Sequence, residues 1–301
     1  MTHIRPERRP IRWLALALPL VFLAAACGDD GDSSSDTTTT TGGTTTTFAA
    51  GTTMARVAES GTLTVGVKFD QPGFGLKNPT TNEVEGFDVE IANAIADAIG
   101  EDVEVNLVES VSKNREPFIQ DGTVDLVVAT YTINDTRKQV VDFAGPYFVA
   151  RQDIMVRADD TSIKAVGDLN GKKVCTVKGS TSATNVTAAA PTADVTLFDT
   201  YSQCAEAMGD GRVEAVTTDN TILAGLVQAS NGAYKLVKAP FSDEPYGIGL
   251  KKGDEAFRTF INDLLEEMFD DGSWAEAFES TLGKIGLDTP APPKVDRYTA
   301  A

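Results

Sequence analysis

The sequence predicts an α/β fold with a mixed, mainly parallel sheet flanked by helices. Short apolar runs, such as residues 63–67 and 124–129, are typical of strands that helices cover on both faces. Between such runs, apolar residues recur with helical spacing, as in residues 87–99, where Gly100 ends the pattern. Residues 54–301 are also long enough to bury a sizeable core in two lobes.

The remaining elements continue this alternation. Strands are predicted at residues 103–107, 154–156, 174–177, 195–198, 213–217 and 246–250. Helices are predicted at residues 116–120, 181–189, 202–208, 219–228, 254–270 and 273–282. Asp88 stands where its side chain can cap the first helix of the series. The sequence contains no internal repeat and no glycine-rich phosphate loop.

The N-terminus is typical of an export signal. Arginines within residues 5–12 precede a short apolar run at 13–26, which is too short and wrongly flanked for a membrane-spanning helix. Residues 23–27 resemble a bacterial lipoprotein signal, in which Cys27 is lipidated and becomes the mature N-terminus. Ala24 stands where Leu is commoner, and ordinary signal cleavage before Cys27 is the alternative. We expect a signal peptide at 1–26 and anchoring to the outer face of the cell membrane.

The segment after the signal is rich in Gly, Asp, Ser and Thr. Such a composition cannot bury a core, so residues 27–54 are predicted to be a disordered tether. A tether between a lipid anchor and a folded domain keeps the domain near the membrane and lets it turn. A flexible leader without a purpose of its own is the alternative.

The charge and the histidine count exclude several kinds of protein. The formal net charge is −18, and residues 1–26 hold four Arg and one Glu, so the mature chain has a net charge of −21. This balance argues against nucleic acid or anionic lipid as a partner, and an anionic ligand would need local cations. The single histidine, His3, lies in the signal, which removes Ser-His-Asp and Cys-His catalysis and histidine-ligated zinc. We expect a monomer with no catalytic residue, metal or cofactor.

Two cysteines remain once Cys27 is set aside. An even pair in an oxidising compartment predicts a disulfide between Cys175 and Cys204. Closing a loop of roughly 30 residues would stabilise the fold by about 3–4 kcal/mol in the chain-entropy model. The alternative is a pair of inert buried thiols.

Several local patterns resemble a known family when they are taken together and in order. They are GFDVE at 86–90, ATYTINDTR at 129–137, VDFAGPY at 141–147, DLNGKKV at 168–174, GST at 179–181 and AVTTD at 215–219. The set is similar to the amino-acid-binding proteins of bacterial ABC importers, the extracellular solute-binding proteins of family 3, over residues 56–285. Within that family, residues 67–73 and 113–116 look most like the glutamate- and aspartate-binding type.

The resemblance implies a type II periplasmic-binding-protein fold with two lobes. The chain would cross between them twice, near residues 148–150 and 240–243. Lobe 1 would comprise residues 55–149 plus 243–290, lobe 2 residues 150–242, and a C-terminal tail residues 291–301.

A captured amino acid needs a partner for each charge, because a closed cleft strips its water. The resemblance places Arg137 on the α-carboxylate, which a guanidinium binds with two parallel hydrogen bonds. It places Asp219 on the ammonium group. The alternatives are a solvated Arg137 and an Asp219 that only caps the following helix.

Further contacts are expected at two turns. Thr130 and Thr132 lie two apart at the end of an apolar strand, so their side chains would face the same way into the cleft. Thr132 also has the spacing of a helix cap with Asp135. Gly179 and Thr181 lie at a strand-to-helix turn, whose free N–H groups attract a carboxylate or are satisfied by a capping side chain.

The residues expected to select the ligand side chain are Lys68, Arg115 and Phe74. Together with Arg137, Lys68 and Arg115 make three candidate cations against one candidate anion, Asp219. This balance of charges favours an anionic ligand. Phe74 would cover the hydrocarbon stem of the ligand. Each cation is otherwise a solvated surface charge, and Phe74 a core or loop aromatic.

The predicted function is capture of glutamate or aspartate by lobe closure and delivery to the permease of an ABC importer. Glutamine or another polar amino acid is the nearest alternative ligand. An exported enzyme on the same fold, such as a cyclohexadienyl dehydratase, is a second alternative, against which the missing histidine argues. A sensor that passes the signal to another protein is a third.

Overall fold

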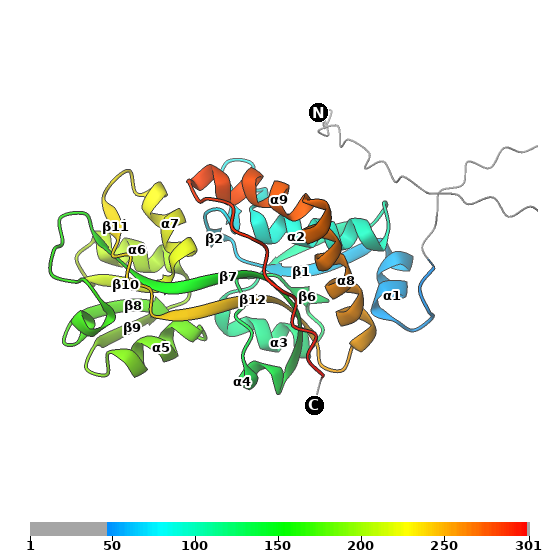
Figure 1. Ribbon diagram of the computed structural model, residues 1–301, viewed down its shortest axis with the longest axis horizontal. Helices are drawn as coiled ribbons and strands as arrows, with labels where there is room; N and C mark the ends of the chain where they lie inside the picture. Colours follow the sequence, from blue (N-terminus) through cyan, green and yellow to red (C-terminus); the bar gives the residue numbers. More distant parts are fainter. Residues whose placement is uncertain (1–46, 300–301) are drawn as a thin grey trace, which may run out of the picture. The chain divides into compact units, whose positions relative to one another are not determined.

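The computed structural model describes residues 47–299 (Figure 1). The predicted signal peptide, Cys27 with its expected lipid, and most of the predicted tether lie outside the described residues. Within residues 47–299, no helix is both long enough and apolar enough to cross a membrane.

Helices and strands alternate through most of the described chain. The α-helices are α1 (Thr53–Ser60), α2 (Phe87–Ile99), α3 (Arg115–Gln120), α4 (Asp135–Lys138), α5 (Thr181–Ala189), α6 (Tyr201–Gly209), α7 (Asn220–Ala229), α8 (Glu255–Asp271) and α9 (Ser273–Thr281). The strands are β1 (Thr62–Val67), β2 (Asp70–Gln71), β3 (Gly75–Lys77), β4 (Val84–Glu85), β5 (Glu104–Glu109), β6 (Leu126–Val127), β7 (Val141–Arg157), β8 (Lys173–Val177), β9 (Asp194–Phe198), β10 (Ala215–Asp219), β11 (Tyr234–Leu236) and β12 (Ser242–Lys251). Short 3-10 helices are η1 (Ser112–Asn114), η2 (Val166–Leu169) and η3 (Leu282–Ile285).

The main sheet has nine strands in the order β5-β1-β6-β12-β7-β10-β8-β9, with β11 paired to β7. The outer strands are parallel at both ends, β5-β1-β6 at one end and β10-β8-β9 at the other. The antiparallel strands β7 and β12 join the two ends. The predicted α/β class with a mixed sheet flanked by helices is therefore confirmed, and the main sheet has four parallel and four antiparallel strand pairings.

Strands β7 and β12 carry the chain between the two halves of the sheet, as Figure 1 shows. They pair from Gln152 and Ser242 at one end to Val141 and Lys251 at the other. Below, lobe 1 denotes the part with β1–β6, α1–α4, α8 and α9, and lobe 2 the part with β8–β11 and α5–α7. The sheets of the two lobes are continuous because the crossing strands stay hydrogen-bonded to each other.

Both lobes are held by apolar burial. In lobe 1, helix α2 buries Phe87, Ile91 and Ile95 on one face, as its four-residue spacing predicts. Full burial of each such side chain contributes about 1.5–3 kcal/mol. Trp274 is also buried, and its indole Nε1 donates to the carbonyl oxygen of Tyr147 at 2.9 Å. This core fixes the strand ends from which the site is built.

The ordered part of the chain extends beyond the predicted lobe boundaries. Residues 53–54, predicted as tether, belong to α1, where Met54 is buried and Thr52 caps the helix. In the C-terminal tail, Val295 is buried, and the hydroxyl of Tyr298 accepts from the Phe143 amide at 2.8 Å. Apolar contact and a strand-edge hydrogen bond therefore dock the tail on lobe 1.

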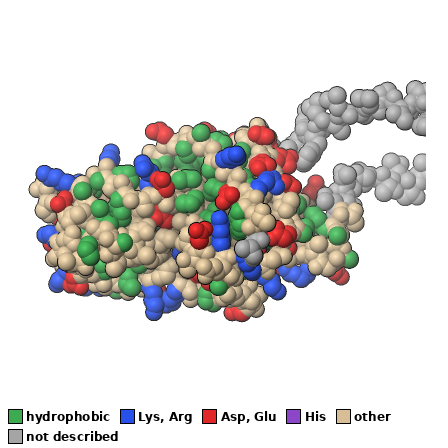
Figure 2. All heavy atoms as spheres, turned by 60° about the horizontal axis from the view of Figure 1, so that its bottom comes forward, with side chains coloured by type: hydrophobic (Ala, Val, Ile, Leu, Met, Phe, Trp, Pro, Cys, Tyr) green, Lys and Arg blue, Asp and Glu red, His purple; other side chains and the backbone are tan. Residues whose placement is uncertain are grey.

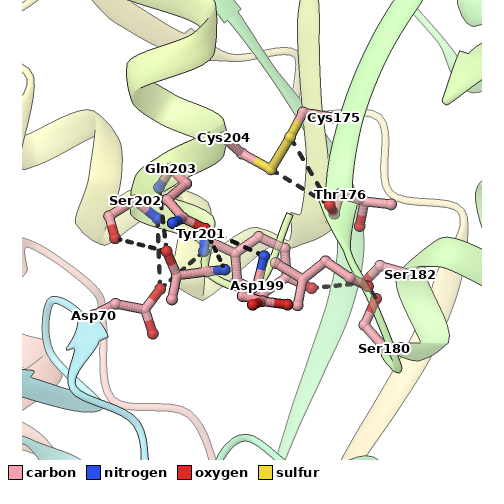
Figure 3. The surroundings of a disulfide bond; sticks show 12 residues. Asp70, Cys175, Thr176, Ser180, Ser182, Asp199, Tyr201, Ser202, Gln203 and Cys204 are labelled. Atoms are coloured by element: carbon pink, nitrogen blue, oxygen red, sulfur yellow. Dashed lines mark hydrogen bonds between the residues drawn. A yellow bond between two sulfur atoms is a disulfide. The ribbon is translucent and has the colours of Figure 1, made fainter. Parts of the chain in front are cut away.

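The predicted disulfide between Cys175 and Cys204 is present, with an S–S distance of 2.02 Å (Figure 3). Cys175 lies on β8 and Cys204 on α6, and both are fully buried. The bond therefore fastens α6 to the strand that leads into the turn at Gly179.

Candidate functional site

A small cavity of about 10 Å³ lies between the lobes. Its lining consists of polar residues from both lobes with one apolar residue: Ser112, Arg115, Thr130, Thr132, Ser180, Thr181, Ser182, Tyr201, Asp219 and Ile222. Sequence reasoning predicted five of these residues and missed the serines, the tyrosine and the isoleucine. Of the predicted ligand residues, Lys68, Phe74, Arg137 and Gly179 do not line the cavity.

Strand topology explains why these residues meet. The segment 128–132 follows β6 in lobe 1, while the turn at 178–180 follows β8 in lobe 2. Asp219 is the last residue of β10, directly before α7. Loops at the carboxyl ends of parallel strands gather at one edge of a sheet, and the crossing strands bring the two edges face to face.

Two arginines of lobe 1 flank the ring of Tyr131. The guanidinium carbons of Arg115 and Arg137 lie 4.4 and 4.7 Å from the ring centroid, in cation–π geometry. Arg115 also donates through Nη1 to the carbonyl oxygens of Ala129 and Thr130, at 3.1 and 3.2 Å. The ring and the carbonyls thus hold the guanidinium of Arg115 at the cavity wall.

Both arginines reach across to lobe 2 at a single carbonyl. The Nη2 atoms of Arg115 and Arg137 donate to the oxygen of Gly179, at 3.3 and 3.1 Å. Gly179 has a φ of +81°, and a Cβ there would lie 2.8 Å from the Cα of Lys113. Only glycine allows this close approach without strain. The lobes are therefore in direct contact in this structure.

Arg137 is engaged by protein groups and does not line the cavity. Its Nη1 donates to the carbonyl oxygen of Thr132 at 2.6 Å, and its Nε lies 3.3 Å from a carboxylate oxygen of Glu116. Burial, followed by the nearby charge of Arg115, lowers the pKa of Arg137 to about 10. Its guanidinium remains charged at neutral pH and is not among the groups that line the cavity.

Asp219 occupies the N-cap position of α7, but its side chain makes no cap hydrogen bond. Its Oδ2 accepts from the hydroxyl of Tyr246 at 2.6 Å, and its buried Oδ1 has no hydrogen-bond partner among residues 47–299. Burial, followed by the charge of Glu244, raises the pKa of Asp219 to about 7. The capping alternative is therefore wrong for this side chain.

The two lobe-1 threonines reach the cavity differently from the prediction. Strand β6 ends at Val127, and Thr130 has a φ of +44°, so Thr130 and Thr132 do not share one face of a strand. The amide of Thr130 instead donates to Asp88 at 3.0 Å, so Asp88 supports this loop and does not cap α2.

The capping alternative for Thr132 is also wrong, because Asn134 caps α4. The hydroxyls of Thr132 and Thr181 both donate to Oε2 of Glu244, each at 2.7 Å. Sequence reasoning missed Glu244, because nothing local marks a carboxylate in a crossing strand as part of a site.

Lys68 does not line the cavity but contacts a residue that does. Its Nζ donates to the hydroxyl of Ser112 at 2.8 Å, and Ser112 in turn lines the cavity. Burial, followed by the charge of Arg115, lowers the pKa of Lys68 to about 7. Phe74 belongs to the core, where its ring makes edge contacts with Phe87, Phe148 and Tyr246. Phe74 is therefore separated from the cavity lining in this conformation.

Further bonds between the lobes involve the start of α6, where Figure 3 shows Asp70 close to Tyr201 and Ser202. Asp70 of lobe 1 accepts from the backbone amides of Tyr201 and Ser202, at 2.8 and 3.4 Å, at the start of α6 in lobe 2. Lys113 pairs with Asp199 at 2.6 Å, and both side chains are substantially exposed. The carboxylate of Asp70 therefore acts as a cap supplied from the opposite lobe.

The face shown in Figure 2 carries Lys and Arg side chains dispersed among acidic ones, without one large basic patch. Within the described residues, no group of three or more His, Cys, Asp or Glu side chains is arranged to hold a metal ion. Several buried charged groups lie around the interlobe cavity, among them Arg115, Asp219 and Glu244.

Two α/β lobes that share crossing strands and enclose a charged, polar cavity define a two-lobe ligand-binding protein. The family model of the bacterial extracellular solute-binding proteins, family 3, matches residues 63–284. The chain belongs to this family, and its fold is that of a type II periplasmic binding protein.

Among curated relatives, the chain is 41% identical over 247 residues to the glutamate-binding protein GluB of Corynebacterium glutamicum, covering 78% of this chain and 83% of that protein. It is 42% identical over 232 residues to the ABC transporter glutamine-binding protein GlnH of Bacillus subtilis, covering 76% and 84%.

Solved structures are similar over the same part of the chain. An ancestral arginine-binding protein bound to glutamine superposes with a TM-score of 0.70 and 41% identity, covering 74% of this chain and 98% of that one. The ancestral amino acid-binding protein AncCDT-1, a precursor of cyclohexadienyl dehydratase, gives a TM-score of 0.71 and 30% identity, covering 77% and 100%.

Proposed function

We propose that the protein captures glutamate between its lobes and delivers it to the permease of an ABC importer. The observation that carries the proposal is one interlobe cavity with both an anion and a cation in its wall. Asp219 brings a buried carboxylate with an unpartnered oxygen, and Arg115 brings a guanidinium from the opposite lobe. A free amino acid presents the complementary pair of charges.

The α-carboxylate of the ligand would be bound by arginine. In this conformation, Arg115 and Arg137 share the neutral carbonyl of Gly179 as an acceptor. A carboxylate is the stronger partner, because hydrogen bonds between ionised groups are roughly twice as strong as neutral ones. Separation of the lobes would release both guanidinium groups from Gly179, and a ligand carboxylate would take its place before the lobes close.

The ammonium group of the ligand would be bound by Asp219. The carboxylate already accepts one hydrogen bond, from Tyr246, and its second oxygen is buried. An unsatisfied buried acceptor costs about 1–3 kcal/mol, and an ammonium donor would remove that cost. Asp219 would also regain its charge, because a nearby cation lowers the pKa of a carboxylate.

Lys68 supports an acidic side chain on the ligand. Its buried ammonium group donates to the hydroxyl of Ser112 and has no carboxylate within salt-bridge distance among the described residues. If the distal carboxylate of the ligand displaced the hydroxyl of Ser112, it would pair with the ammonium group of Lys68.

Glutamine is the second candidate ligand. Glu244 contacts two cavity threonines, and it adds an anion that the balance of charges in the sequence did not include. The similarity to GlnH supports the same alternative. An exported dehydratase is the third candidate, although AncCDT-1, the similar precursor of such an enzyme, is itself an amino acid-binding protein. Incubation with prephenate or arogenate would test it, and we expect no product.

Titration calorimetry against glutamate, aspartate, glutamine and arginine tests the proposal. We expect glutamate to bind most tightly and arginine not to bind. Tighter binding of glutamine would transfer the assignment to the amide, and binding of none of the four would refute capture of an amino acid. We further propose a monomer anchored through lipidated Cys27 on the outer face of the cell membrane, which Cys27→Ala should release into the medium.

A further inference from the structure

A carboxylate in a crossing strand connects both lobes to the cavity. Glu244 lies on β12, a crossing strand labelled in Figure 1, and the residue is 1% exposed. Its Oε2 accepts from the hydroxyls of Thr132 in lobe 1 and Thr181 in lobe 2, each at 2.7 Å. Its Oε1 accepts from Nδ2 of Asn185 in lobe 2 at 2.8 Å and from the hydroxyl of Ser242 at 2.7 Å.

These bonds use the whole accepting capacity of the carboxylate. An ionised carboxylate has about four acceptor positions and no proton to donate. All four donors are neutral groups, and they come from lobe 1, lobe 2 and the crossing strand itself. Because Thr132 and Thr181 lie on opposite lobes, separation of the lobes must break at least one bond to a buried anion. Glu244 therefore favours the closed arrangement.

The same bonds set the direction of both threonine hydroxyls. Each hydroxyl has one proton, and a contact of 2.7 Å to a carboxylate oxygen requires that the hydroxyl donates it. The two hydroxyl oxygens are 3.3 Å apart, and no proton remains to lie between them. Thr132 and Thr181 consequently offer only lone pairs to anything that enters the cavity.

We infer that Glu244 is a positioning residue that holds the hydroxyls of Thr132 and Thr181 as acceptors for the ammonium group of the ligand and links the two lobes. The inference rests on the proposed capture of an amino acid. The expectation from the sequence concerned the free N–H groups of the turn at Gly179 and Thr181. The inference concerns the hydroxyl of Thr181, which Glu244 directs so that it joins Asp219 on the ammonium side. The ligand carboxylate is left to the guanidinium groups and to those N–H groups.

The variant Glu244→Gln reverses this direction. Asn185 Nδ2 donates to Gln152 Oε1 at 2.9 Å as well as to Glu244, so its orientation is fixed by a second partner. The glutamine oxygen must then face Asn185, and its NH₂ group must face the threonines. The threonine hydroxyls would accept from the amide and point their own protons towards the ligand.

The experiment compares glutamate with glutarate, which lacks the amino group, on the purified protein by calorimetry. We expect the ratio of the two affinities to fall at least tenfold in Glu244→Gln. In the matched control Asp243→Asn, the ratio should stay within twofold of the wild-type value, because Asp243 pairs with Arg151 and its side chain is 71% exposed. An equal loss for both ligands, or no loss, would overturn the assigned direction of the hydroxyls.

A second variant and a ligand-free measurement complete the test. Thr181→Val removes one acceptor without altering Glu244, so it should weaken glutamate at least fivefold more than glutarate; equal weakening would count against the inference. Small-angle X-ray scattering without ligand should give a larger radius of gyration for Glu244→Gln than for Asp243→Asn. Equal radii would overturn the link between the lobes, even if the wild-type protein binds no amino acid.

Discussion

Asp70 is expected to control affinity without touching the ligand. Its carboxylate, on lobe 1, accepts from the first two amides of α6 on lobe 2, at 2.8 and 3.4 Å. Helix α6 is held in place by the disulfide one turn further on (Figure 3). The cap therefore forms only when the lobes are in contact, so its whole free energy contributes to closure.

Replacement of Asp70 by alanine removes that cap. The N-cap residue of α6, Thr200, stays in place, and Asp70 is an additional acceptor for the first two amides. By analogy with an N-cap, the loss of such an acceptor costs about 0.5–2 kcal/mol, typically about 1. Since every 1.4 kcal/mol is tenfold in Kd, the affinity for ligand should fall by about fivefold and by no more than about 30-fold. Most of the change should appear as faster dissociation, because a broken interlobe bond shortens the life of the closed state.

Stopped-flow measurement of ligand dissociation, alongside calorimetry, provides the assay. Asp70→Asn is the matched control, because asparagine caps helices about as well as aspartate. It should retain the wild-type dissociation rate. Equal rates for the wild-type protein and Asp70→Ala would refute the cross-lobe cap. A similar defect in both variants would instead assign the effect to the charge of Asp70, which lies close enough to influence Lys68.

Three further outcomes are expected. Arg137→Ala should weaken ligand binding by about 3–5 kcal/mol in calorimetry, because a buried carboxylate loses its partner; near-normal affinity would contradict the assignment. Since the pKa of Asp219 is raised to about 7, the folded protein keeps a proton that the unfolded chain releases above about pH 4. The stability that this proton contributes to the ligand-free protein is present at acidic pH and is lost as the pH rises to 7. Urea titrations at pH 4.5 and pH 7 should therefore show a smaller fall in the free energy of unfolding for Asp219→Asn than for the wild-type protein. An identical fall in both proteins would contradict the raised pKa of Asp219. Reduction of Cys175–Cys204 should lower the melting temperature by roughly 10 °C, from a loss of about 3–4 kcal/mol; an unchanged midpoint with both thiols alkylated would exclude a stabilising role.

Hydrophobic periodicity predicted the bounds of long helices well, because the spacing that defines a helix lies within the helix itself. The predicted helices at 181–189 and 254–270 agree with α5 and α8 to within one residue. Strand β7 was predicted only at 154–156, whereas it extends over Val141–Arg157 and includes Gly145 and Pro146. The strand continues through them, with the amide of Gly145 donating to Asn262 at 2.8 Å. A partner distant in sequence satisfies the backbone, and local signals cannot show it.

The site shows the same division between local and distant information. Thr132, Thr181 and Asp219 were found because each lies in the ordered set of motifs, and Arg115 because residues 113–116 look like the glutamate- and aspartate-binding type. Glu244 was missed, because its partners come from three separate parts of the chain. The residues expected to select the ligand were placed less well: Phe74 is a core residue, and Lys68 reaches the cavity only through Ser112.

The amino-acid sequence by itself determined the α/β class, the disulfide partners and the family, because alternation, cysteine parity and motif order are all properties of the linear chain. Only the tertiary structure decided which charges share the cavity and in which direction the threonine hydroxyls point. Hydrogen-bond direction and buried pairing depend on distances of about 3 Å between segments far apart in sequence. The folded chain sets those distances, and among the described residues Glu244 and Asp70 are two of the carboxylates that link the lobes.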